Sequence, residues 1–546
     1  QDEGSVIDNA STGYLDRDQQ GTANSFNYNY WSSSVGPIAS SGNSNYTISG
    51  VLKDGSKTEI PLSINFGSNY RYADGDLSAD GVSQKLSSYW LYKFNGPSGD
   101  YNSWFRTNQI SQLVPGEGYT MKGTSGKVSI ATKQNYKFRG KPYNGDISLT
   151  ISAGNSRLIG NPYPSAIDAD EFILDNISEG EGRNSVNVFN GVLYFWHHFG
   201  DESSHILKEY VGGYATYTLM GGVEAYSTNA LINNATPLIG GGKIPERNIA
   251  VNQGFFVSAV KDIDLTGDII VSGGTIVFKN SQRVFERERV TAENSDGSVF
   301  FKGVKETTNA KTVGKTKTDL RPKIRLEFNS PKGIHRQLLV GADKRATKNY
   351  DLGFDAPIAD LNKEDAFWVF NESKFVIQAV DNFNKSQELP LGMKLEIDGI
   401  ATIKIHSVEN LGTNFELFIK DNSTGETYSI IENSFEMNLT AGEYLDRFSL
   451  VFQPRLKTIE EVKLIDGVFI YMNNINDVIN IRKIVDTKIE NVTAFNLLGQ
   501  KVGYWNTTSY SNEREMELPF SSKQTGVYIV QINTSNGIIN KKIICN

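Results

Sequence analysis

The chain of 546 residues has very little cysteine and histidine: one cysteine, Cys545, and five histidines. A single cysteine excludes a disulfide framework within the chain, and it also excludes a zinc site built on several cysteines. The fold must therefore be held together by its apolar cores rather than by covalent or metal cross-links.

Long apolar runs and helical repeats are also lacking. No run is long enough to span a membrane, and no secretory signal pattern is visible at Gln1. The sequence therefore predicts a chain that is not an integral membrane protein. It is either cytosolic or the mature form or a fragment of an exported protein, and the abundance of Asn, Ser, Thr and aromatic residues favours export. The net charge of -8 argues against a nucleic-acid partner, whose phosphates require a basic face.

The sequence also lacks local motifs of known catalytic sites. The sequence has no G-x-S-x-G elbow, no H-E-x-x-H motif, no Walker loop and no dinucleotide fingerprint. A nucleophile built on Cys545 is disfavoured, because the residue is next to last in the chain. We therefore expect no enzymatic activity and no cofactor. A hydrolase whose carboxylates meet only in space stays open as an alternative.

Glycine, aromatic and β-branched residues are what the sequence has in quantity, with 51 Gly, 25 Tyr and 29 Phe. Short apolar segments separated by turn residues predict an all-β protein of several β-sandwich domains in tandem, Ig-like or jelly-roll-like, with few helices. One helix is expected over residues 165–173, where acidic residues follow two prolines and suit the start of a helix.

Recurring landmarks predict four domains. Residues 116–121 match residues 252–257, and the aromatic segment 88–92 matches 193–196, which indicates a degenerate duplication. The predicted domains are β-rich modules over 1–140 and 141–292, a β-sandwich over 293–456 and a C-terminal domain over 457–546. The Lys- and Thr-rich stretch 302–321 is expected to be an exposed linker or a long mobile loop.

Several side-chain clusters are candidates for ligand binding. A loop with Asp74, Asp76 and Asp80 around glycines is the best candidate for calcium, although a solvated acidic loop is the favoured interpretation. For the histidines a satisfied polar role is favoured over a metal site. For an acidic helix face a solvated surface is favoured, and a further weak oxygen-ligand candidate is interpreted as a turn. These three groups are His197, His198 and His205; Asp168, Asp170, Glu171 and Asp175; and Asp351 with Asp355.

Six tryptophans are spread over all predicted domains, and this spacing favours core positions. Exposed, coplanar aromatic rings would instead stack on sugar rings. A carbohydrate-binding adhesin with a surface glycan as partner is therefore the main alternative function.

The last 88 residues contain three motifs that resemble the C-terminal sorting domain of type IX secretion cargo from Bacteroidota. Strand-like segments separated by turn residues carry them. The motif residues are Asn496, Leu497, Leu498, Gly499, Gln500, Lys501 and Val502, then Gly526, Val527 and Tyr528, then Lys541 and Lys542.

The resemblance implies a small Ig-like sandwich of about seven strands. It also implies partners, namely the outer-membrane translocon and a carrier barrel in the outer membrane, and a location at the cell surface, associated with the outer membrane, or secreted. Upstream, five segments resemble the modules of large secreted or gliding-associated surface proteins: 29–33, 160–166, 253–257, 417–422 and 441–448. We therefore expect a non-enzymatic exported cargo protein. We expect it to serve surface assembly, adhesion or gliding.

Overall fold

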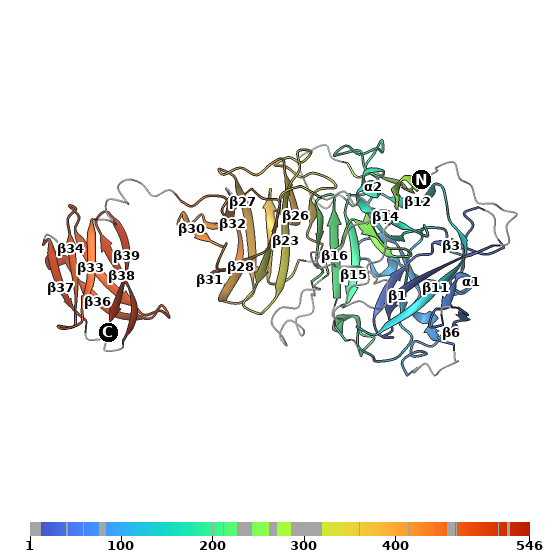
Figure 1. Ribbon diagram of the computed structural model, residues 1–546, viewed down its shortest axis with the longest axis horizontal. Helices are drawn as coiled ribbons and strands as arrows, with labels where there is room; N and C mark the ends of the chain where they lie inside the picture. The colour runs from blue at the N-terminus through green and yellow to red at the C-terminus, as the bar shows by residue number, and fades with distance from the viewer. Residues whose placement is uncertain are drawn as a thin grey trace. The chain divides into compact units, whose positions relative to one another are not determined.

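The computed structural model describes most of the chain and divides it into two compact units. We call them the N-terminal unit, residues 1–454, and the C-terminal unit, residues 455–546. Each has its own apolar core. Figure 1 shows that the regular structure of both units consists almost entirely of strands, which confirms the all-β prediction. The described residues are 13–39, 42–57, 59–75, 83–198, 200–201, 203–210, 212–226, 243–260, 270–285, 319–359, 361–412, 415–455, 465, 467–510, 513–520 and 525–545.

A nine-stranded sheet forms the centre of the first half of the N-terminal unit. Its order is β17-β16-β15-β19-β13-β8-β10-β2, with β9 paired to β8. Buried aromatic residues dominate these strands, as expected where strands pack on both faces. The strands are β2 (Tyr28–Trp31), β8 (Tyr92–Pro97), β9 (Trp104–Arg106), β10 (Tyr119–Lys122), β13 (Asn155–Gly160), β15 (Leu193–His198), β16 (Gly212–Thr218), β17 (Gly221–Val223) and β19 (Gly254–Ser258).

Strands from both sides of the predicted boundary at residue 140 share this sheet. The orders β2-β10-β8 and β13-β19-β15 are equivalent, because the matched landmarks occupy matched strands. The turns before β10 and β19 also correspond: Gly116 and Asn252 both have positive φ, 81° and 62°. The backbone of Ser32 donates to the Asn252 carbonyl at 2.8 Å, and that of Gly160 donates to the Gly116 carbonyl at 3.0 Å. The two copies therefore contact each other through reciprocal pairs.

Smaller sheets complete the first half of this unit. A long strand, β11 (Lys133–Pro142), spans the predicted boundary. It pairs with β1 (Leu15–Thr22) over the whole length of β1. The other strands are short, and they either extend this sheet or form separate small sheets of two or three strands. They are β3 (Val35–Gly36), β4 (Leu52–Asp54), β5 (Leu62–Ser63), β6 (Asn65–Gly67), β7 (Lys85–Ser87), β12 (Ile147–Ser152), β14 (Ala166–Asp168), β18 (Asn248–Ile249), β20 (Gly273–Phe278) and β21 (Arg283–Val284).

Helices are few and short among the described residues. The predicted helix over 165–173 is present but begins later, because residues before Asp168 pair as β14. Asp168 caps the helix by accepting hydrogen bonds from the Asp170 and Glu171 backbones, and two acidic residues occupy the first turn. The helices are α1 (Ile48–Val51) and α2 (Ala169–Leu174), with 3-10 turns at Ser88–Trp90, Tyr101–Ser103, Leu207–Glu209, Asn280–Gln282 and Thr508–Tyr510.

The acidic face expected to be solvated is largely buried, so that expectation is wrong. Asp170 accepts a hydrogen bond from the Tyr217 hydroxyl at 2.8 Å and lies 3.4 Å from Arg247. Asp175 is paired with Arg183 at 2.6 Å. Arg183 is close to Asp175 in the chain, but Tyr217 and Arg247 come from distant segments, which local sequence cannot reveal. The acidic turn Asp351–Asp355 is a turn as predicted, but Asp355 is buried and accepts from backbone amides.

The second half of the N-terminal unit is an eleven-stranded sheet of order β30-β29-β32-β27-β25-β26-β23-β22-β28-β31, with β24 paired to β26. All neighbours are antiparallel except β23 and β26. The strands are β22 (Lys323–Asn329), β23 (His335–Ala342), β24 (Ala356–Pro357), β25 (Asp365–Phe370), β26 (Ser373–Val380), β27 (Glu388–Leu395), β28 (Gly399–Glu409), β29 (Phe418–Asp421), β30 (Glu426–Ser429), β31 (Phe435–Leu439) and β32 (Gly442–Val451).

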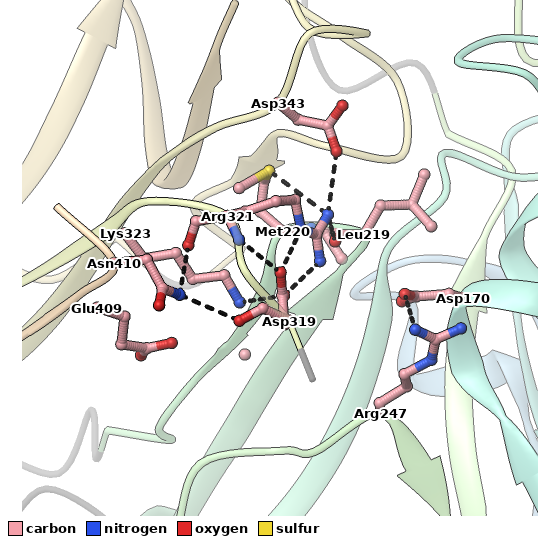
Figure 2. A network of polar contacts seen from close by, with 12 residues as sticks. Asp170, Leu219, Met220, Arg247, Asp319, Arg321, Lys323, Asp343, Glu409 and Asn410 are labelled. Atoms are coloured by element: carbon pink, nitrogen blue, oxygen red, sulfur yellow. Dashed lines mark hydrogen bonds and ion pairs between the residues drawn. The ribbon is translucent and has the colours of Figure 1, made fainter. Parts of the chain in front are cut away.

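A charged joint connects the two large sheets of this unit (Figure 2). Arg321 lies at its centre: it pairs with Asp319 at 2.6 Å and Asp343 at 3.2 Å, and it donates to the Leu219 carbonyl. Lys323 adds a second cation on Asp319 at 2.7 Å. The apolar core runs continuously across the same junction. Residues on both sides of the predicted boundary at 292 therefore form one packed body. Most of the linker predicted at 302–321 lies outside the described residues.

The C-terminal unit is a pair of facing sheets, one of three strands and one of four. Its core contains Val492, Val530, Ile532 and Ile539, all fully buried. The pairing orders are β33-β34-β37 and β36-β35-β38-β39. The strands are β33 (Val468–Asn473), β34 (Val478–Lys483), β35 (Ile489–Phe495), β36 (Lys501–Asn506), β37 (Glu515–Pro519), β38 (Gly526–Thr534) and β39 (Gly537–Cys545). Among the described residues of the whole chain, no helix has the length and apolar character to cross a membrane.

Candidate functional site

The first sorting motif forms the tight turn between β35 and β36. The Asn496 side chain accepts hydrogen bonds from the backbone amides of Leu498 and Gln500 at 3.0 and 2.9 Å. It also donates to the Gln500 side chain at 2.8 Å. Gly499 has a φ of 76°, a conformation that residues with a Cβ rarely adopt. Asn496, Gly499 and Gln500 therefore shape the backbone of the turn.

The two leucines of this motif face solvent. Leu497 is 71% exposed and Leu498 is 83% exposed, at the tip of the turn. Large apolar side chains held outward on a rigid turn have no role in the core of their own unit. Surface patches of this kind are typical of binding sites. The pair is therefore the apolar part of the exposed motif surface.

The rest of the first motif continues into β36. The Lys501 ammonium lies 4.0 Å from the centre of the Tyr504 ring, a cation–π contact on an exposed strand. Val502 is half-buried and packs against the core. β36 is an edge strand, since among the described strands only β35 pairs with it.

The second motif begins β38. Tyr528 is buried, and its ring packs edge-on against Phe520 at 5.2 Å. Val527 points the other way, towards the outer face, where it lies opposite Ile544 of β39. Gly526 has no atom within 4 Å of the place a Cβ would take. This motif therefore contributes one core anchor and one surface residue.

The third motif lies on the edge strand β39. Lys542 is exposed and lies opposite Ile529 of β38, whereas Lys541 is half-buried on the opposite face. Ile538 and Ile544, which sequence analysis did not single out, are exposed on the same face as Lys542. Strand alternation was the signal that could have identified them. The outer face of this sheet is thus an apolar surface that includes Lys542, bounded by an edge that is unpaired among the described strands.

The candidate calcium ligands are only partly described. Asp74 is paired with His205, whose Nε2 lies 3.1 Å from both carboxylate oxygens. Asp76 and Asp80 lie outside the described residues, so the calcium site stays a prediction. Within the described ranges, no group of three or more His, Cys, Asp or Glu residues has the arrangement to hold a metal ion.

The histidine cluster belongs to a buried aromatic and polar core. The Lys122 ammonium lies 2.8 Å from Nδ1 of His205 and 3.8 Å from the centre of the Trp90 ring, and it contacts the Tyr210 hydroxyl. The His205 ring stacks on Trp90 at 4.6 Å. Burial, followed by the charge of Lys122, lowers the pKa of His205. Asp74, His205 and Lys122 therefore form a chain of contacts that positions the loop of Asp74 against the sheet.

The two adjacent histidines end strand β15 and are buried there. Nε2 of His198 accepts hydrogen bonds from the Tyr28 backbone at 2.6 Å and the Trp196 indole at 2.8 Å. Burial lowers the pKa of His198 to about 3 and holds the pKa of His197 well below its ordinary value. Both are therefore neutral at physiological pH, and His198 has a structural role in the strand.

Comparison with known proteins gives two family matches. The family described as a domain of unknown function (DUF8693) matches residues 74–452. The family described as a secretion system C-terminal sorting domain matches residues 469–546. The second match covers all three sorting motifs and confirms the prediction made from them: the chain is type IX secretion cargo and is exported.

No curated protein matches the chain. Among the solved structures that match is one titled "Biofilm associated protein - BSP domain". It is 9% identical, the match covers 89% of this chain and 98% of that one, and the TM-score is 0.13. A superposition at that score supports no inference about this chain.

Proposed function

Since the chain belongs to the DUF8693 family, a domain of unknown function, and carries a secretion system sorting domain, we propose that it is a non-enzymatic surface protein. In this proposal the C-terminal unit is recognised by the export machinery, and the N-terminal unit is the cargo that acts at the cell surface. The observation that carries it is the separation of the two units, each with its own core.

The exposed side of the C-terminal unit supports recognition by a protein partner. Leu497 and Leu498 project from a turn whose backbone is fixed by Asn496 and Gly499. Because the turn is rigid before binding, little conformational entropy is lost when a partner contacts the leucines. We propose that this turn is one contact of the translocon.

The edge of the same unit supports a second contact. β39 presents backbone groups along an edge that no described strand pairs with, and it exposes Ile538, Lys542 and Ile544 on its outer face. Addition of a strand to such an edge gives affinity through main-chain hydrogen bonds and specificity through alternate side chains. We propose that the carrier barrel or the translocon binds here.

The proposed task of the N-terminal unit is surface assembly, adhesion or gliding without catalysis. Its two large sheets form one body through the Arg321 joint and a continuous core. Such a body suits a load-bearing or ligand-presenting role, because contacts made at one end are transmitted through packed strands. The absence of catalytic motifs from the sequence supports the non-enzymatic part of the proposal.

Deletion of residues 455–546 tests the proposal. Cell-surface and culture-medium fractions of the producing bacterium are analysed by quantitative mass spectrometry for peptides of the N-terminal unit. We expect the truncated chain to accumulate inside the cell and to remain folded, since its core is complete. Export of the truncated chain at the level of the full chain would overturn the proposal.

A further inference from the structure

A cleft of about 790 Å³ lies in the N-terminal unit, where the nine-stranded sheet meets the turn between β25 and β26. Its volume falls within the roughly 300–1,000 Å³ typical of small-molecule sites. One wall is formed by residues 357–359 and 372–374. The other wall and the floor are aromatic: Phe94, Tyr101, Trp104, Tyr194, Tyr214 and Phe256.

Contacts between the rings fix the position of the aromatic wall. Trp104 packs edge-on against Phe94 at 5.0 Å and against Phe256 at 5.8 Å, and it keeps part of its surface open to the cleft. The Tyr214 hydroxyl lies 3.0 Å from the Tyr30 hydroxyl, which fixes its ring. Tyr101 stands at the mouth and is 73% exposed. A ligand that stacks on these rings meets surfaces that are already positioned.

Polar groups surround the aromatic surface. Asp100 and Glu372 line the cleft together with four serines, Ser98, Ser156, Ser258 and Ser373. Asn371 and Glu372 form the two-residue turn between β25 and β26 with φ values of 45° and 65°. Glycine or asparagine is favoured at such turn positions, so a glutamate there is an unusual choice. Strained backbone of this kind is concentrated at functional sites.

The charges that face the cleft favour a neutral ligand over an anion. Two carboxylates line it, and the one cation among the described lining residues, Lys374, is paired with Glu443 at 2.7 Å. Phosphates and acidic polymers would be repelled by this arrangement. Asp100 already accepts hydrogen bonds from Asn102 and Ser103, and Ser156 is hydrogen-bonded to Ser258. A purely apolar ligand would still take the Glu372 carboxylate out of water, which is costly.

We propose that this cleft binds a neutral saccharide. The C–H face of a pyranose ring would stack on Trp104 and Tyr101, because the apolar hydrogens of the sugar carry partial positive charge that suits the negative face of an aromatic ring. Its hydroxyls would donate to Glu372 and exchange hydrogen bonds with the serines. The proposal is independent of the export route, since it concerns only side chains of the N-terminal unit.

Binding is tested with the purified full chain. Neutral oligosaccharides with equatorial hydroxyls, namely cellotetraose, xylotetraose and chitotetraose, are titrated calorimetrically after a screen on a glycan array, with tetragalacturonate as the anionic comparison. Tyr101→Ala removes the most exposed ring without touching the core. Trp104→Ala removes the inner ring, and Glu372→Gln removes the charge while keeping the length of the side chain. The matched control is Phe105→Ala, the next residue on β9, which is 48% exposed and does not line the cleft.

We expect at least one neutral saccharide on the array to bind. We also expect Tyr101→Ala and Trp104→Ala each to weaken its binding about tenfold and Phe105→Ala to leave it unchanged. Circular dichroism of each variant verifies the fold, and Tyr101→Ala keeps the test decisive if Trp104→Ala does not fold. The proposal is overturned if no neutral glycan binds, if tetragalacturonate binds more tightly than the neutral sugars, or if binding survives Tyr101→Ala unchanged. Failure here would leave the export result untouched, so the two proposals fail separately.

Discussion

Residues of the sorting motifs divide into those that shape the C-terminal unit and those that face outward from it. Asn496 and Gly499 build a turn, Tyr528 anchors the core, and Leu497 and Leu498 make no contribution to either. The motif spacing identified the segment in the sequence, because turn chemistry is local. Which motif residues are exposed depends on pairing with β38 and β39, and this follows only from the folded sheet.

The exposed leucines allow export to be separated from stability. We expect the double substitution Leu497→Ser and Leu498→Ser to reduce export strongly while changing the free energy of unfolding of the C-terminal unit by less than about 0.5 kcal/mol, since neither side chain is packed. Ile475→Ser is the matched control, because Ile475 is 93% exposed on a different turn of the same unit. Secreted protein is quantified by immunoblot and stability by urea unfolding. Equal export of the double variant and the control would contradict this role.

Carboxylates at the joint make the stability of the N-terminal unit depend on pH. Burial of Asp343 opposes ionisation, but hydrogen bonds from Arg345 and the charge of Arg321 lower its pKa from 3.8 to about 2. The unfolded chain therefore takes up this proton first as the pH falls. The stabilisation from Asp343 is complete above about pH 4 and is lost as the pH falls towards 2.

Asp343→Asn removes that titration. We expect the free energy of unfolding of the N-terminal unit to fall less steeply between pH 4 and pH 2 in the variant than in the wild type, and to be lower than wild type at pH 7, where the pairs with Arg345 and Arg321 are lost. Urea unfolding at fixed pH values measures both. Asp381→Asn, at an exposed position, controls for the loss of one acidic residue. Unchanged slopes in Asp343→Asn would refute the contribution of this residue.

The secondary-structure elements show which features local sequence can predict and which it cannot. Helix α2 was predictable from the prolines before it and its acidic residues, yet its start was not, because residues 166–168 pair with β18 and β21. The landmarks of the duplication lie in equivalent strands, but their contacts, such as Ser32 with Asn252, join segments far apart in the chain. The aromatic cleft and the Arg321 joint also combine distant residues, and no local pattern marks them.

The backbone conformation of the turn between β35 and β36 can be tested by substitution of its glycine. Gly499 and Gly526 both have open space where a Cβ would lie, but only Gly499 has positive φ. We expect Gly499→Ala to destabilise the C-terminal unit by roughly 1–2 kcal/mol through backbone strain alone. Gly526→Ala is expected to be close to neutral. Chemical unfolding of the two variants measures the difference, and equal stabilities would show that the turn relaxes without cost.

At the scale of the whole molecule, the two cores predict two unfolding transitions. Ile532→Ala removes a fully buried side chain from the C-terminal core, so it should destabilise that unit by about 2–5 kcal/mol. The transition of the N-terminal unit should not move, because its core shares no residue with the other. Differential scanning calorimetry of the full chain distinguishes the transitions. A shift of both by the same amount would indicate a single cooperative unit.

We expect the C-terminal unit to direct export by itself, through the surface that its fold presents. The direct measurement is the fraction of a reporter protein found outside the cell when residues 455–546 are fused to its C-terminus and an export signal takes it across the inner membrane. We predict that the fusion is released or displayed at the surface and that the same fusion carrying Leu497→Ser and Leu498→Ser is retained. Retention of the wild-type fusion inside the cell would show that the C-terminal unit does not direct export by itself.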